Sequence, residues 1–390
     1  MNLKGKCAIA GVGITAMGKI YGRTPTDFAA EAIDLALENA GLTNRDVDGL
    51  LINAGIAPGL GLALQNTLGF RDLRLLNQMN AFGSTAPAMV QFASLAIAAG
   101  MANVVVCVFA DAPLAEGLSA GAAYGGRGVA GQPSGMVGLL HAYGFFGANA
   151  GYALAAQRHM ELYGTTSEQL GAVAVSTRQW AGMNPRAQKR EPITLADHQA
   201  SRFIVEPLRL LDCCLVSNGG AAVVVTSAER ARDLRQKPAY VLGMGQGHPG
   251  DPMRAGREPM VDTGARLAGE TAFAMAGITP ADVAACEIYD CYTYTVLVTL
   301  EDYGFCAKGE GGDFVSDGNL GPGGDLPVNT GGGQLSGYYM WGMTPVSEAV
   351  LQLQGNEGER QLDDPRYLLV TGNGGVLNYH GCLVLGSQPD

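Results

Sequence analysis

Two segments late in the chain place proton-exchanging side chains beside a glycine-rich backbone. The first ends an apolar run and carries a phenol, a carboxyl and a thiol group in succession at residues 289–291. The second, residues 329–342, joins three consecutive glycines to two tyrosines, ahead of a helix that we expect Thr344-Pro345 to cap. Glycines let a backbone approach a ligand closely, and a loop before a helix offers free N–H groups. Such a loop alone is weak evidence, so both segments are candidates only.

The candidate residues in these segments are Tyr289, Asp290, Gly331, Gly332, Gly333, Tyr338 and Tyr339. Two histidines join them. His380 ends a glycine-containing loop at residues 374–381 and is a possible proton carrier, and His248 follows the glycine-rich strand exit at residues 243–247. A structural role remains the alternative for both histidines. Asp290 could orient Tyr289 or cap a turn.

A loose dinucleotide-binding pattern occurs near the N-terminus, where Gly11, Gly13 and Ala16 have the required spacing. That mechanism needs a helix to begin at the glycines and to direct its N-terminus at a pyrophosphate. Here the helix signals appear only at Thr24-Pro25, so we interpret the glycines as a tight strand exit and expect no nucleotide cofactor.

Apolar runs alternate with amphipathic stretches, which is typical of an α/β protein with buried strands. The pattern predicts strands at residues 7–14, 50–53, 104–110, 221–226 and 367–371 and helices at 24–40, 84–99 and 345–354. Between about residues 111 and 205 the pattern breaks, with one helix expected at 148–163. This stretch is too long for a simple connection, so we predict an inserted segment there.

The chain contains an internal repeat. Residues 40–47 and 276–283 share the order alanine, glycine, aliphatic, threonine, two variable residues, aspartate and valine, and each copy follows an alanine-rich helix. The flanking strands and helices match in the same order. We therefore predict one α/β unit used twice, as an N-terminal half at 1–235 that includes the insertion and a C-terminal half at 236–390.

Composition excludes several classes of protein. The net charge is −11, and no basic cluster is present to bind nucleic acid. No apolar run is long enough to span a membrane. The eight cysteines show no pair with zinc-binding spacing, so we expect no metal and buried thiols in a reducing cytoplasm.

The order and spacing of these segments resemble the thiolase superfamily, and within it the sterol-carrier-protein thiolase branch. Residues 289–292 match the family's HDCF-type segment, and residues 329–342 match its NPxGG…GHPxG segment. Residues 158–165 and 210–221 are also close to that branch. The resemblance implies a thiolase fold, with two duplicated βαβαβαββ halves in five layers (αβαβα) and an inserted loop domain. It also implies a CoA thioester ligand and a homodimer.

The chain departs from the thiolase pattern at the reactive positions. Asn80 stands where the family has its nucleophilic cysteine, and Tyr289 and Tyr339 stand where it has two histidines. The second thiolase cysteine, near residues 372–375, is also missing. Asparagine cannot form an acyl-enzyme, so ordinary thiolysis should fail.

These losses make the chain similar to the thiolase-like aldolases of bacterial steroid side-chain degradation. The resemblance implies a retro-aldol cleavage of a β-hydroxyacyl-CoA, most simply a 17-hydroxy steroid that yields a 17-ketosteroid and propionyl-CoA. Tyr289 and Tyr339 would transfer protons, and Asn80 with the loop 331–333 would shape the thioester site. It also implies a small OB-fold partner, of the kind associated with an acyl-CoA hydratase, and a homodimer within a heterotetramer or larger assembly. No cofactor beyond the substrate's CoA is expected.

Two other functions stay open. The chain could be a transferase or condensing enzyme with an unconventional nucleophile such as Ser84, or a non-catalytic subunit that binds acyl-CoA. The tyrosines could also have a purely structural role, because a buried tyrosine is usually a core residue whose hydroxyl group is hydrogen-bonded. Packing is the interpretation we favour for Tyr292, Tyr294 and Tyr338, with Tyr338 kept as a substrate-binding candidate.

Overall fold

The computed structural model describes residues 3–124, 135–145, 147–250, 258 and 260–390. Its strands are β1 (Cys7–Ile14), β2 (Gly49–Ala54), β3 (Leu75–Gln78), β4 (Val104–Asp111), β5 (Phe203–Val205), β6 (Leu208–Arg209), β7 (Gly219–Ser227), β8 (Ala239–Gly247), β9 (Ala285–Glu287), β10 (Tyr367–Gly374) and β11 (Tyr379–Gly386). Its helices are α1 (Pro25–Ala40), α2 (Leu64–Thr67), α3 (Thr85–Ala98), α4 (Ala120–Tyr124), α5 (Gly135–Ala142), α6 (Gly147–Tyr163), α7 (Ser167–Met183), α8 (Leu195–Ala200), α9 (Ala228–Arg232), α10 (Ala265–Ala276), α11 (Thr293–Tyr303), α12 (Gly311–Phe314) and α13 (Met343–Gln354). The strands and helices predicted from the sequence are all present, with ends that shift by at most three residues.

Nine strands form one mixed sheet in the order β3-β2-β4-β7-β1-β8-β11-β10-β9. In the first half, β2 runs parallel to β4, and β7 is antiparallel to both β4 and β1. The second half repeats these directions with β9, β10, β11 and β8. The counterpart of β3 is reduced to a single parallel bridge between Cys286 and Val328. The duplicated topology predicted from the repeat is therefore confirmed.

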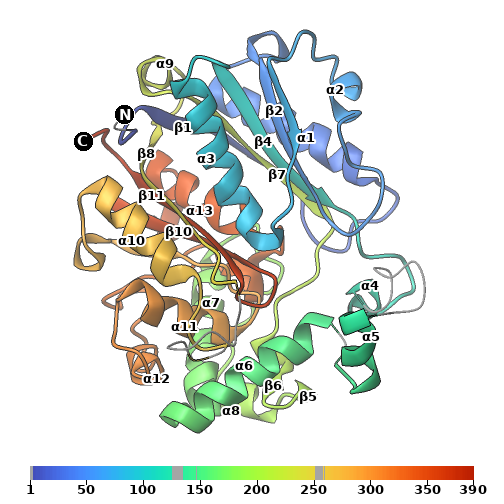
Figure 1. Cartoon of the computed structure of the whole chain (residues 1–390), viewed down its shortest axis with the longest axis vertical. Coiled ribbons are helices and arrows are strands. Elements are labelled where there is room, and N and C mark those ends of the chain that lie inside the picture. The colour runs from blue at the N-terminus through green and yellow to red at the C-terminus, as the bar shows by residue number, and fades with distance from the viewer. Residues whose placement is uncertain (1–2, 125–134, 146, 251–257, 259) are drawn as a thin grey trace.

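The helices build layers around these strands (Figure 1). Helix α1 packs on β1, β4 and β7, and α10 packs on β8 and β11. Helices α3 and α13 contact each other and strands of both halves, so they lie between the two half-sheets. The half-sheets join through a short β1–β8 pairing of Ala8 with Tyr240 and Ile9 with Ala239. The arrangement is the five-layered αβαβα fold that the resemblance implied.

The repeated sequence produces the same local structure twice. Helix α1 begins with a capping box, in which Asp27 Oδ2 accepts from the Thr24 N–H at 2.8 Å, and Pro25 occupies the first turn. It ends at Gly41, whose φ of 76° is left-handed, and α10 ends the same way at Gly277 with a φ of 69°. Each helix is followed by a 3₁₀ turn that begins at a threonine and contains an aspartate.

The insertion predicted at about residues 111–205 contains α4 to α8 and β5, and β6, the strand that pairs with β5, follows its predicted end. Residues 125–134 and 146 lie outside the described part of the chain. The helix expected at 148–163 is α6. Helix α7 packs against α11 and against the turn Gly333–Gly337, so the insertion supports the second candidate segment. The predicted boundary at residue 235 falls between α9 and β8. No helix in the described ranges is both long and apolar enough to cross a bilayer.

Candidate active site

The structure brings the two tyrosines of the candidate segments together. Tyr289 follows β9 and is 4% exposed, and Tyr339 is partly buried after the turn Gly333–Gly337. Their hydroxyl oxygens lie 3.0 Å apart, which is a hydrogen bond in which either can be the donor. The ring centroids are 6.4 Å apart with the planes at 60°. A proton can therefore pass directly between the two phenol groups.

Tyr289 is fixed at its backbone and at its ring. Its N–H donates to Thr371 Oγ1 at 3.4 Å, and its carbonyl accepts from Thr295 Oγ1 at 3.0 Å. The ring lies directly on Gly83, because a Cβ at that position would come within 2.1 Å of Tyr289 Cε2. Only glycine leaves room for this ring at the start of α3.

Tyr339 is held by residues from outside its own turn. Its N–H donates to Ser217 Oγ at 3.0 Å, and Ser217 Oγ accepts from Gln188 Nε2 at 2.6 Å. The helix cap predicted at Thr344-Pro345 is wrong. Helix α13 begins at Met343, and the Thr344 hydroxyl instead donates to the carbonyl of Tyr338 at 3.1 Å. Thr344 therefore closes the loop that carries Tyr339.

Asp290 supports the glycine turn. Its carboxyl group is fully buried and accepts from the N–H groups of Gln334 at 2.7 Å and Leu335 at 3.2 Å. Burial raises the pKa of Asp290 to about 7, and these N–H bonds oppose that rise. These bonds support the turn as the role of Asp290.

The three glycines are required by packing. A Cβ on Gly331 would meet Glu348 Oε2 at 2.5 Å, one on Gly332 would meet Ala181 Cβ at 2.6 Å, and one on Gly333 would meet Asp290 Oδ2 at 2.1 Å. The N–H groups of residues 334–338 all donate within the protein. These amides are therefore already satisfied, and the expectation of free N–H groups in this part of the loop is not met.

Asn80 lies at the surface, at the entrance to the loop that leads into α3. Its Oδ1 accepts from the N–H of Phe82 at 3.0 Å. Phe82 has a left-handed φ of 52°, and Gly83 then brings the chain against Tyr289. The predicted substrate-binding residue thus shapes a loop that touches the Tyr289 ring.

Two other candidates, Tyr338 and His248, bond to residues outside the pair. The hydroxyls of Tyr338 and Ser347 are 3.0 Å apart, so Tyr338 faces α13, and burial raises its pKa. His248 is exposed, its Nε2 is 3.1 Å from Gln246 Oε1, and its ring lies edge-on to Tyr379. These contacts support packing for Tyr338 and a surface position for His248.

His380 is fully buried on β11, opposite Asn373 of β10. Burial, and next the charge of the neighbouring His248, lower the pKa of His380 to about 3, and an interaction with the Leu377 backbone opposes this shift. The imidazole is therefore neutral at physiological pH. It can accept a proton only at a large energetic cost.

Sequence reasoning missed Tyr152, Asn373 and Gly83. Asn373 Nδ2 donates to the Tyr152 hydroxyl at 3.1 Å, and the ring of Tyr152 lies 4.6 Å from that of Tyr292. Burial raises the pKa of Tyr152, with Tyr289 among the neighbouring groups that add to the rise. Asn373 falls in the stretch of the missing second cysteine, which was a usable signal. Tyr152 belongs to the insertion, where nothing in the sequence marked it.

None of the eight cysteines has the environment of a nucleophile. All are free, and burial raises the pKa of every one. An activated cysteine needs the opposite shift, toward the thiolate. Among the described residues, no group of three or more His, Cys, Asp or Glu side chains could hold a metal ion.

Comparison with known proteins decides the family. Residues 245–387 match the family described as thiolase C-terminal domain-like. The chain is 41% identical to a steroid side-chain-cleaving aldolase of Thermomonospora curvata, over 95% of this chain and 96% of the relative. It is 39% identical to the 17-hydroxy-3-oxo-4-pregnene-20-carboxyl-CoA lyase of Mycobacterium tuberculosis, over 96% of this chain and 98% of that relative. The chain belongs to this family of thiolase-like aldolases. The predicted resemblance is confirmed.

Solved structures agree with this assignment. A structure described as an Ltp2-ChsH2(DUF35) aldolase superposes with a TM-score of 0.88 at 39% identity and covers 99% of both chains. A monomeric SCP2-thiolase-like protein of Mycobacterium smegmatis has a TM-score of 0.76 at 19% identity, which shows the fold alone. The fold and the carbon–carbon lyase class of this aldolase therefore agree with the expectations from its sequence.

Proposed function

We propose that this aldolase cleaves a 17-hydroxy steroid that carries a short acyl-CoA side chain, and releases a 17-ketosteroid and propionyl-CoA. The observation that carries the proposal is the 3.0 Å hydrogen bond between Tyr289 and Tyr339, at the two positions where thiolases have histidines. The names of the two relatives, both with about 40% identity over nearly the whole chain, support the substrate class.

The tyrosine pair can complete the proton cycle of a retro-aldol reaction. One phenolate takes the proton from the β-hydroxyl group, the Cα–Cβ bond breaks, and its electron pair becomes the thioester enolate. The other phenol gives its proton to the enolate carbon, which leaves a ketone and a shorter acyl-CoA. The hydrogen bond between the phenols then returns the proton from the first oxygen to the second. The cycle consumes no proton and requires no cofactor.

A free phenol has a pKa of about 10, so the pair must favour one phenolate. A hydrogen bond from one phenol to the oxygen of the other stabilises a single negative charge shared between them. The same arrangement places a donor where negative charge develops on the substrate. The pair therefore works as a unit that holds one proton fewer than two neutral tyrosines.

Acyl transfer is the weaker alternative. It requires a nucleophile, and burial disfavours the thiolate at every cysteine, including Cys291 beside Tyr152. Ser84 is 1% exposed and donates its hydroxyl proton to the carbonyl of Ala81 at 3.1 Å. Among the hydrogen bonds of Ser84, none is to a histidine that could act as its base.

The assembly is also part of the proposal. The similar solved structure is described as an Ltp2-ChsH2(DUF35) aldolase, which supports a small second subunit for this chain. We propose an OB-fold partner associated with an acyl-CoA hydratase, a homodimer of this chain within a heterotetramer or larger assembly, and a cytoplasmic location. The test of function is a cleavage assay with the chain and its partner co-expressed. Both products should appear from the 17-hydroxy steroid acyl-CoA, and absence of both from a folded complex would reject this substrate.

A further inference from the structure

A buried acidic cluster connects the strand before Tyr289 to the residues before the glycine turn that leads to Tyr339. Glu287 is the last residue of β9, and Thr330 lies just before the glycine turn. Thr330 Oγ1 is 2.8 Å from Glu287 Oε1 and 2.8 Å from Glu348 Oε1 of α13. The exposed fractions of Glu287, Thr330 and Glu348 are 2%, 0% and 3%. Two carboxyl groups thus face one hydroxyl group away from water.

The hydrogen atoms around Thr330 can be counted. Its hydroxyl group has one hydrogen and can donate to only one of the two carboxyl groups. Gln352 Nε2 lies 3.0 Å from Thr330 Oγ1, and its two hydrogens are shared among Thr330 Oγ1, Glu348 Oε1 and the carbonyl of Arg360. This amide group offers only donors here, because Gln352 Oε1 accepts from the Leu362 N–H at 3.0 Å. The second carboxyl group must therefore carry a proton and donate it to Thr330 Oγ1. Without this proton, two oxygen lone pairs would face each other inside the core.

The charges nearby place that proton on Glu287. Glu348 is paired with Arg360, which also pairs with Glu357, and Glu357 Oε2 lies 2.9 Å from Arg186 Nη1. Two guanidinium groups thus face three carboxyl groups, so the cluster is neutral when one carboxyl group is protonated. Glu287 forms no ion pair with a described residue. Burial, and next the charge of Glu348, raise the pKa of Glu287 well above its usual range.

Further hydrogen bonds next to this cluster join the segment that leads to Tyr289 with the segment that leads to Tyr339. Asn329 Oδ1 accepts from the N–H of Ile288 at 2.7 Å, and the Asn329 N–H donates to the carbonyl of Cys286 at 2.9 Å. The N–H of Thr330 donates to Glu287 Oε1 at 3.1 Å. Strand β9 and the residues before the glycine turn are therefore joined along consecutive residues, directly before Tyr289 on one side and ahead of the turn that leads to Tyr339 on the other.

We propose that Glu287 is a protonated positioning residue, whose bond to Thr330 sets the separation of the Tyr289 and Tyr339 hydroxyl groups. This inference rests on the proposed function of the pair. The charged and titratable groups around Glu287 are Glu348 from α13, Arg360 from the turn after it and Cys286 beside it on β9, with Glu357 and Arg186 beyond them. Asp290 and Tyr338 line the same small cavity as Glu287 and Glu348. When Glu287 ionises at alkaline pH, two carboxylates share the one hydrogen of the Thr330 hydroxyl group. Glu287 and Glu348 then repel each other, and the two segments separate.

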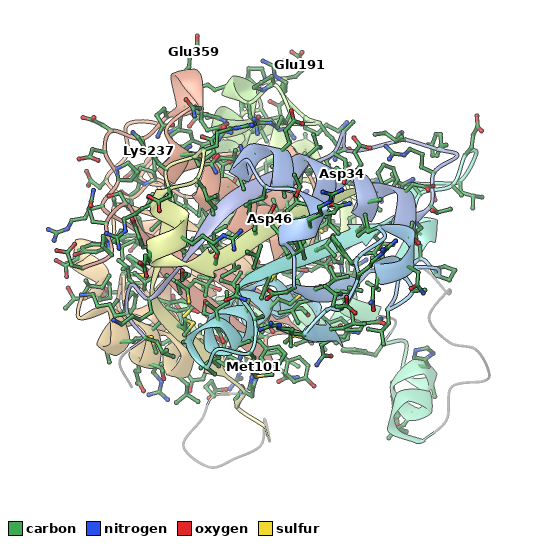
Figure 2. All side chains as sticks on the ribbon, turned by 90° about the horizontal axis from the view of Figure 1, so that it is seen from above. Asp34, Asp46, Met101, Glu191, Lys237 and Glu359 are labelled. Carbon is green, nitrogen blue, oxygen red and sulfur yellow. The ribbon has the colours of Figure 1, made fainter. Side chains whose placement is uncertain are left out.

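An infrared measurement tests the proton without reference to activity. The native protein at pH 7 should show the carbonyl band of a protonated carboxylic acid, and Glu287→Gln should remove intensity from it. Glu359→Gln is the matched control, because Glu359 projects from the surface next to Arg360 (Figure 2). An equal band in native protein and Glu287→Gln would overturn the proposal, whatever the assay for cleavage shows.

Activity tests the positioning role. Glu287→Gln stays uncharged at every pH, so the alkaline fall of kcat should move to higher pH, with KM unchanged. At pH 7 its kcat should drop less than about tenfold, the cost of one neutral hydrogen bond. Glu287→Asp can still ionise and should keep the alkaline fall, and Glu359→Gln should match the native profile. An alkaline fall that is the same in Glu287→Gln as in the native protein would overturn the role.

A second pair of variants applies if Glu287→Gln does not fold. Thr330→Val removes the hydroxyl group between the two carboxyl groups, and Thr330→Ser restores it. The proposal requires Thr330→Val to shift the infrared acid band and to lower kcat at constant KM, and Thr330→Ser to recover both. The proposal would be contradicted if Thr330→Ser restored neither the infrared band nor kcat, or if the band did not shift in Thr330→Val.

Discussion

The hydroxyl oxygens of Tyr289 and Tyr339 lie 3.0 Å apart although 50 residues separate them in the chain. One tyrosine follows the end of a strand and the other follows a glycine turn, and buried side chains join these two segments. The distance is short enough for direct proton exchange between the phenols. This relationship connects the thiolase-like fold to a cleavage reaction that needs no covalent intermediate.

Gly83 should be intolerant of any side chain. In Gly83→Ala the new Cβ would lie 2.1 Å from the Tyr289 ring and 2.3 Å from the Asn373 carbonyl oxygen. We expect a loss of about 1–3 kcal/mol in unfolding free energy and a marked fall in kcat, because the ring must move. Chemical denaturation and the cleavage assay measure both. Gly121→Ala is the control, since nothing lies within 4 Å of its Cβ position. An unchanged Gly83→Ala enzyme would show that the ring position is not fixed by this contact.

Asp290 should make stability depend on pH. Its folded-state pKa of about 7 lies above the ordinary value of 3.8, so the folded protein binds the proton more tightly than the unfolded chain. This contribution is complete below about pH 4 and is lost as the pH rises through 7. Asp290→Asn cannot titrate, so the difference in Tm between the variant and the native protein should change across this window. A constant difference from pH 4 to pH 8 would contradict the assignment.

Asp290→Asn should also weaken the turn that carries Tyr339. One of the two N–H donors, Gln334 or Leu335, would then face an NH₂ group in place of an oxygen. We expect a lower kcat at every pH, with amide exchange accelerated at residues 333–337. Exchange as slow as in the native protein would show that the turn does not depend on this carboxyl group.

No acyl-enzyme should form. All eight thiols have a raised pKa, and Ser84 is buried with its hydroxyl group bonded to Ala81. Intact-protein mass spectrometry after incubation with substrate and a rapid acid quench should show only the unmodified mass. A stoichiometric acyl adduct would favour the transferase alternative.

Much of the fold could be predicted because its signals are local. Strands such as β4 and β7 are continuous apolar runs, and α1 carries its own start and stop signals in Thr24 and Gly41. The repeat in the sequence predicts the duplicated topology, and each copy indeed has the same 3₁₀ turn after its helix. The reduced counterpart of β3 could not be foreseen, because a single bridge at Val328 leaves no pattern in a sequence.

The site was predicted in part. Tyr289 and Tyr339 were found because both fall on reactive positions of the resembled family, and the structure joins them. Their supporting contacts, from Gly83 and Ser217, come from distant elements and depend on the packing of the whole fold. The same packing explains why Asp290 binds the glycine turn and why Thr344 lies inside α13 rather than at its cap.

The most direct test of the central claim is the cleavage rate of Tyr339→Phe beside that of Tyr289→Phe and the double variant, each with its partner and a 17-hydroxy steroid acyl-CoA. We predict that each single variant lowers kcat about 10²–10⁴-fold with little change in KM, the usual loss on removing a general acid or base. The double variant should be no slower than the worse single variant, because the two phenols act as one unit. Full turnover by a folded Tyr339→Phe enzyme would contradict the account.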